Sequence, residues 1–143
     1  MSGRLPAEGP TGAGCALGLV IGVVVVIVEA LTFSLLTGRP LDLDQEWGPL
    51  LCQMLLAAAP FVILALAGIR YKLPWLIALA LTLALWGNLL FEGVSYQRHP
   101  DGSGANIGIG LIMMASPIAI AAIGLAVHAL QQWRERGRRG GRP

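Results

Sequence analysis

One acidic residue, Glu29, lies within a long apolar run and is the side chain of this sequence best suited to chemistry. An acid at the centre of a membrane helix costs about 2.5–3.5 kcal/mol on insertion scales, so such residues are functional by default. Its carboxyl group can clamp two helices by hydrogen bonding, or it can bind a proton or a cation. Either role requires a polar group or a cavity beside it, which other helices must supply.

Four other polar residues are predicted to lie near the layer of Glu29: Gln53, Asn88, Glu92 and Ser116. Asn88 and Glu92 are one helical turn apart and therefore share a face of their helix. In an antiparallel arrangement, Asn88 and Ser116 fall at a similar depth to Glu29, whereas Gln53 and Glu92 are shallower. The sequence thus predicts a candidate intramembrane polar site, in the outer half of a helical bundle, formed by these five residues.

Four apolar runs must position these side chains. Each run approaches or exceeds the roughly 20 residues that cross about 30 Å of hydrocarbon. The chain is 55% hydrophobic and only 13% charged, whereas soluble domains carry about 25% charged residues. We therefore predict an all-α, polytopic membrane protein whose four transmembrane helices cover residues 14–37, 49–69, 74–96 and 105–130.

The basic residues are distributed unevenly between the two sides of such a protein. With the N-terminus inside the cell, eight of the ten lie on the cytoplasmic side, and only Arg39 and Arg98 lie outside. An excess of Lys and Arg is typical of cytoplasmic loops. The sequence therefore predicts an antiparallel four-helix bundle with both termini in the cytoplasm. Its richness in Ala, Gly and Leu, with Arg preferred over Lys, favours a bacterial inner membrane.

The chain divides into three segments. A cytoplasmic head covers residues 1–13, the transmembrane domain covers 14–132, and a basic tail covers 133–143. Because the tail is rich in Arg and Gly, it is predicted to be disordered and to contact anionic lipid headgroups at about 1 kcal/mol per charge. It is too short, and too poor in interleaved aromatic residues, to predict nucleic-acid binding.

Small residues and prolines indicate how the helices pack. Gly14, Gly18 and Gly22 form a stripe with a four-residue repeat, which allows another helix to approach closely. Glu29 falls on nearly the same face and is expected to extend this packing surface. Pro60 and Pro117 lie in mid-span, where each removes a backbone hydrogen bond and is expected to kink its helix.

No pattern in the sequence indicates a metal, a cofactor or a catalytic centre. His99 and His128 are placed on opposite sides of the membrane, so they cannot share a metal ion. Paired-histidine, phosphate-binding and nucleophile-elbow motifs are all missing. A calcium loop requires a glycine turn and further oxygen ligands, which are lacking around the acids of the first outer loop, Asp42, Asp44 and Glu46.

Three functions remain compatible with these features. We predict a structural or accessory membrane component without catalytic activity, which associates through its helices as a homo-oligomer or within a larger membrane complex. The alternative is a homo-oligomeric, proton- or cation-coupled small transporter or channel that uses Glu29. A third hypothesis, an enzyme acting on a lipid or quinone, uses interfacial residues that form no recognised motif: Glu92, His99 and Asp101.

Overall fold

The computed structural model describes residues 11–40, 43–69, 71–98 and 107–140. Its four elements are all helices: α1 (Thr11–Thr37), α2 (Leu43–Leu66), α3 (Lys72–Arg98) and α4 (Ile107–Gly140). Each helix contains a stretch that is long and apolar enough to cross a membrane. The prediction of an all-α chain with four helices long and apolar enough to span a membrane is therefore confirmed, and this finding supports a multi-pass membrane protein.

Most of the apolar surface of these helices faces outward. Only 11% to 39% of each apolar stretch is buried within the chain, and large side chains such as Leu35, Phe91 and Ile118 are exposed. Water would make such a surface a site of aggregation. Lipid can solvate such a surface, and helices satisfy their own backbone hydrogen bonds, as hydrocarbon requires.

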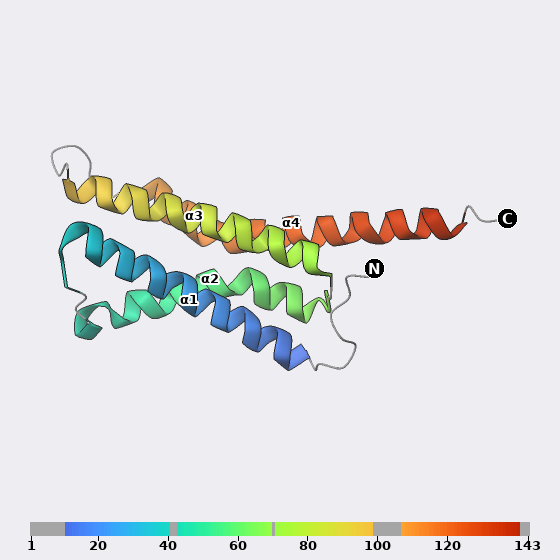
Figure 1. The fold of residues 1–143 in the computed structure, drawn as a ribbon, viewed down its shortest axis with the longest axis horizontal. Helices are drawn as coiled ribbons and strands as arrows, with labels where there is room; N and C mark the ends of the chain where they lie inside the picture. The colour runs from blue at the N-terminus through green and yellow to red at the C-terminus, as the bar shows by residue number, and fades with distance from the viewer. Residues whose placement is uncertain (1–10, 41–42, 70, 99–106, 141–143) are drawn as a thin grey trace.

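The helices run between two ends of an elongated molecule (Figure 1). At one end, here called the terminal end, α1 and α3 begin while α2 and α4 finish. At the opposite end, here called the distal end, α1 and α3 finish. The largest interface joins α1 to α2, and α3 packs mainly on α4. Although the connection between α2 and α3 is short, these two helices pack on each other less than any other contacting pair.

Two glycines end α1 and α2 by adopting left-handed backbone conformations. Gly38 has a φ of 69°, and its amide donates to the carbonyl of Ser34 at 2.9 Å. Gly68 also has a φ of 69°; its amide donates to Ala65, and the amide of Ile69 donates to Leu64. This second pattern is a Schellman motif, which satisfies carbonyls that the helix end would otherwise leave free.

Two apolar clusters form the core. The first contains Phe61, Leu64 and Ala78, which are completely buried, and the ring of Phe61 lies 5.9 Å from that of Trp75, centre to centre. The second cluster lies nearer the distal end and contains four buried residues of α1, α2 and α3: Val25, Val26, Ala57 and Trp86. Helices α2 and α3 therefore form the centre of the core, because both contribute to each cluster.

The glycine stripe of α1 faces α2. A Cβ atom added at Gly22 would lie 2.6 Å from both the Cβ and the backbone nitrogen of Ala58. An added Cβ would lie 2.9 Å from the Cβ of Phe61 at Gly18, and 3.1 Å from the Cβ of Ala65 at Gly14. The two helices therefore approach most closely at Gly22, where only a hydrogen atom fits between the backbones.

Pro117 leaves the carbonyl of Met113 without its usual amide donor, because proline has no N–H. The hydroxyl of Ser116 donates to this carbonyl at 2.9 Å. Both Pro60 and Pro117 are buried, and α2 and α4 continue through them as helices. A neighbouring side chain thus replaces the bond that Pro117 removes.

The helices also extend beyond the predicted spans. The first begins at Thr11, within the predicted head, and α2 begins at Leu43, six residues before the predicted start at 49. The last continues to Gly140, whereas the sequence predicted disorder from residue 133. Gln, Arg and Glu are good helix formers, and the hydroxyl of Tyr71 donates to Glu135 at 3.0 Å. Residues 1–10 and 141–143 lie outside the described residues.

Replacing Gly22 with alanine is expected to destabilise the protein by about 1–3 kcal/mol, the usual cost of overpacking. The new methyl group meets the backbone of Ala58, which cannot rotate away as a side chain can. Smaller losses of stability are expected for Gly18→Ala, and the smallest for Gly14→Ala. Thermal unfolding in detergent, followed by circular dichroism, ranks the three variants by stability.

Gly110→Ala is the matched control, because nothing lies within 4 Å of a Cβ atom at that position. Alanine also has a higher helix propensity than glycine by about 1 kcal/mol, so the control should keep or gain stability. Equal stability for Gly22→Ala and the control would contradict the close packing of α1 on α2.

Candidate functional site

A groove opens in the distal half of the molecule, where α1, α2 and α3 meet. Figure 1 shows α1 crossing α2 and separating from it toward the distal end. The groove has a volume of about 420 Å³. Three residues of each helix line it: Glu29, Ala30 and Phe33 of α1, Pro49, Leu50 and Gln53 of α2, and Leu89, Leu90 and Gly93 of α3.

Glu29 and Gln53 are the two polar side chains of this groove, which we call the Glu29 groove. They enter it from different helices, and both are half-buried. The carboxyl group of Glu29 thus lines the same groove as the Gln53 amide, which can act as a hydrogen-bond donor or acceptor.

The register of α1 on α2 explains why Glu29 meets Gln53. Gly14, Gly18 and Gly22 lie against successive turns of α2. The order of the glycines along α1 is the reverse of the order of these turns along α2, so the two helices are antiparallel. Continuing this antiparallel register by two turns places Glu29 opposite the first half of α2, near Gln53. Glu29, which was expected to extend the packing face of the glycines, thus lines the groove between α1, α2 and α3.

Asn88 and Glu92 are not part of the Glu29 groove. Both side chains are exposed on α3, while their neighbours Leu89, Leu90 and Gly93 line the groove. Adjacent residues lie about 100° apart around a helix, so Leu89 and Gly93 can line the groove while Asn88 and Glu92 point away from it. The structure therefore brings Glu29 and Gln53 together and leaves the other polar residue pair of the predicted site outside.

Ser116 also lies apart from the groove. Its hydroxyl bonds to the carbonyl of Met113 in its own helix, and it does not line the groove at Glu29. Its role follows from Pro117, which is next to it in the sequence. A serine directly before a mid-span proline is the sequence signal that could have predicted this hydrogen bond.

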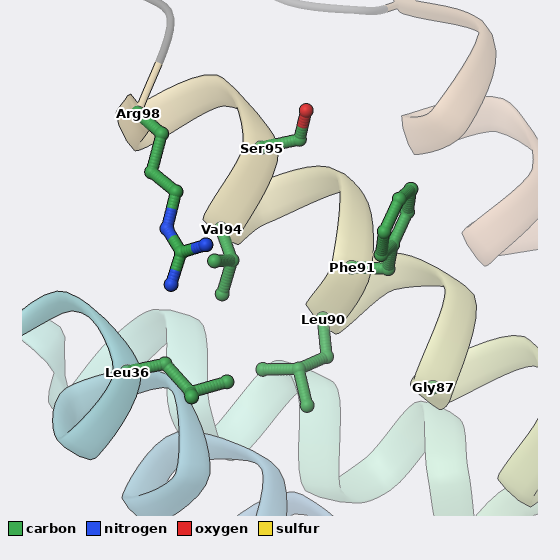
Figure 2. Close-up of a pocket in the computed structure, with 7 residues that line it drawn as sticks. All are labelled: Leu36, Gly87, Leu90, Phe91, Val94, Ser95 and Arg98. Carbon is green, nitrogen blue, oxygen red and sulfur yellow. The ribbon is translucent and has the colours of Figure 1, made fainter.

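A second groove, of about 440 Å³, lies on the other side of the contact between α1 and α3. Leu90 lines both grooves. Figure 2 shows Arg98 folding back from the end of α3 toward Val94, with Leu36 of α1 facing them. The remaining lining residues are Gly87, Leu90, Phe91 and Ser95. This groove is apolar along its length and cationic at the distal end.

A polar cluster at the terminal end was not predicted. The rings of Tyr71 and His128 lie 5.2 Å apart, centre to centre, and Tyr71 also bonds to Glu135. The Nε2 atoms of His128 and Gln132 lie 3.0 Å apart. The four-residue spacing of His128 and Gln132 was a visible signal, but the predicted end of the span at 130 separated them. The cluster joins α4 to the start of α3.

Two of the three residues of the enzyme hypothesis, His99 and Asp101, lie outside the described residues, as does Asp42 of the acidic loop. Across residues 11–40, 43–69, 71–98 and 107–140, no three His, Cys, Asp or Glu side chains lie close enough to hold a metal ion together. The Glu29 groove, which an acidic side chain lines, is thus the candidate site.

These features define a small multi-pass membrane protein with a carboxyl group in a groove between its helices. No protein-family model, no curated protein and no solved structure matches the chain. No relative therefore supplies a ligand or an activity, and both are inferred from the geometry.

Glu29→Cys combined with Gln53→Cys should allow a short bifunctional thiol reagent to join α1 and α2, because both positions line one groove. Cys15 and Cys52 are first replaced with serine to remove competing thiols. Peptide mapping of the reduced and alkylated product identifies the linked pair.

Glu29→Cys combined with Asn88→Cys is the matched control and should remain unlinked within one chain. Residue 88 faces outward on α3, so the reagent cannot bridge the two thiols through the helix. Linkage of 29 to 88 without linkage of 29 to 53 would show that α3 is rotated relative to this arrangement.

Proposed function

We propose that this protein is a non-catalytic structural or accessory membrane component that associates with a second copy of itself through the exposed face of α3. The observation that supports this proposal is the outward position of Asn88 and Glu92 within an apolar helix. In an isolated chain these polar side chains meet lipid. A second helix that covers them removes this unfavourable contact.

Asn88 and Glu92 lie well inside the span. They precede Arg98 by ten and six residues, which corresponds to roughly 15 Å and 9 Å along the helix axis. The hydrocarbon core is about 30 Å thick, so with Arg98 at its boundary Asn88 lies near the midplane. Polar residues at such depths almost always face other helices or a water-filled cavity.

The exposed face of α3 is also suited to close packing. Buried residues of α3 recur at every fourth position: Pro74, Ala78, Thr82 and Trp86. Ala80 and Ala84 lie about 200° around the helix from this ridge, and both are exposed. An added Cβ at the nearby Gly87 would meet nothing within 4 Å. Small residues of this kind let two helices approach while Asn88 and Glu92 form hydrogen bonds between them.

A second copy is the partner that this face fits best. Asn88 carries both donors and an acceptor, so the same amide can bond to its counterpart across a two-fold axis. A two-fold interface uses one surface on both subunits and must be self-complementary. An axis along the membrane normal places both copies of Asn88 at the same depth, where they meet directly.

The orientation and location complete the proposal. We place both termini in the cytoplasm because eight of the ten basic residues then lie on that side. We place the protein in a bacterial inner membrane on its composition. Arg134 and Arg136 are exposed near the end of α4, where they can contact anionic headgroups.

Replacing Asn88 and Glu92 together with leucine is expected to lower the association constant by about tenfold. Hydrogen bonds between membrane helices contribute about 0.6–2 kcal/mol each, and 1.4 kcal/mol corresponds to a factor of ten. Energy transfer between fluorescently labelled chains in liposomes, measured across a series of protein-to-lipid ratios, gives the constant.

Ser116→Ala is the control for loss of a polar group in a span. Its hydroxyl serves its own helix, so association should be unchanged. A wild-type protein that stays monomeric at every ratio would refute self-association. A double variant that associates as strongly as the wild type would move the interface away from α3.

A second candidate function is the conduction or coupled transport of protons or monovalent cations by a homo-oligomer. The position of Glu29 in a groove, with Gln53 as its polar neighbour, favours it. Four helices alone leave little room for a continuous pathway, so this candidate also requires association of several copies.

Proteoliposomes containing the wild type or Glu29→Gln test this second candidate. If Glu29 lies on a pathway, the wild type should carry protons or monovalent cations, and the variant should lose that flux because it cannot carry the charge. The absence of flux in folded, correctly inserted wild-type protein would refute conduction and leave self-association as the proposed function.

A further inference from the structure

We propose that the Glu29 groove binds an organic ammonium ion with apolar substituents. The groove presents one acidic group, one amide and walls that are otherwise apolar. Such walls bury the alkyl groups of a ligand, while the carboxylate offsets its positive charge in a region where an unpaired charge is costly. The ligand and the site are therefore complementary in both polarity and charge.

The oxygen atoms of the groove favour an organic cation over a hard metal ion. Its side chains supply two carboxylate oxygens from Glu29 and one amide oxygen from Gln53. A calcium ion takes about 6–8 oxygen ligands, which this lining does not provide. A quaternary ammonium ion needs no such shell, because its carbon substituents already surround the charge.

Phe33 adds an aromatic wall to the groove. A Cβ atom added at Gly93 would lie 3.3 Å from the edge of this ring. The ring therefore spans the space between α1 and α3. Aromatic faces attract cations through the ring quadrupole, and quaternary ammonium ligands use this interaction. The volume of about 420 Å³ also falls within the range of about 300–1,000 Å³ that is usual for small-molecule sites.

Access is expected from the side of the molecule. The groove lies between the distal halves of three membrane-spanning helices, and Pro49 in its lining is exposed. An amphiphilic ammonium ion partitions into the membrane interface and can enter laterally. Binding in this groove depends neither on self-association through α3 nor on ion flux, so each of the three ideas can fail separately.

Isothermal titration of the purified protein in a neutral detergent tests the proposal. The probes are tetrabutylammonium and tetrabutylborate, which have nearly the same shape and opposite charges. We expect the wild type to bind the cation at least tenfold more tightly than the anion. Glu29→Gln should weaken cation binding at least tenfold, while Glu29→Asp keeps the charge and should weaken it less.

Glu135→Gln is the matched control, because it changes the net charge equally at the terminal end, away from the groove. Its cation affinity should equal that of the wild type. Phe33→Leu should weaken binding of the cation several-fold without the same effect on the borate. If circular dichroism shows that Glu29→Gln is unfolded, the proposal is tested by Phe33→Leu and by the affinities of the wild type for the ammonium ion and the borate.

Two results would overturn the proposal. One is folded wild-type protein that binds the ammonium ion no more tightly than the borate, which would reduce the interaction to hydrophobic partitioning. The other is a folded Glu29→Gln variant with wild-type affinity, which would place the cation elsewhere. Neither result bears on the energy transfer between labelled chains or on ion flux.

Discussion

The close contact between the glycine stripe and α2 determines the positions of the other features. At Gly22 a single methyl group would meet the backbone of Ala58, so the two helices can be this close only with glycine at that position. Crossing there fixes the register along the rest of α1. It brings Glu29 to the side of α2 that carries Gln53, and it leaves the distal part of the interface open because two crossing helices diverge on either side of their contact.

The polar side chains in the spans differ in how their hydrogen bonds are satisfied. Thr32, Thr82 and Ser116 donate to carbonyls of their own helices at 2.6, 2.8 and 2.9 Å. These residues need no partner on another helix. Glu29 and Gln53 share a groove, and Asn88 and Glu92 face outward. A continuous polar layer is therefore not needed to explain these residues.

The sequence was sufficient to predict the features that depend on chain length and spacing. Four apolar runs predicted four spans, and the four-residue repeat of Gly14, Gly18 and Gly22 indicated a packing face. The relative positions of residues along one helix also follow from the sequence, because the rise per residue is constant. The rotation of α3 was not predictable, since its helix is apolar nearly all round and no polarity difference separates the lipid-facing side from the packed side. The spacing along α3 therefore could not indicate that Asn88 and Glu92 lie outside the groove that contains Glu29.

The same helix, α3, carries two surfaces with opposite roles. Leu89 and Gly93 form one wall of the Glu29 groove, while Asn88 and Glu92 point away from it. A helix of a second copy, placed on the outward face as proposed, would therefore cover Asn88 and Glu92 without contributing to the lining of the groove. Residues of α1, α2 and α3 complete that lining within one chain. The proposed association surface and the proposed binding site thus lie on different faces of α3, and neither needs the other to be complete.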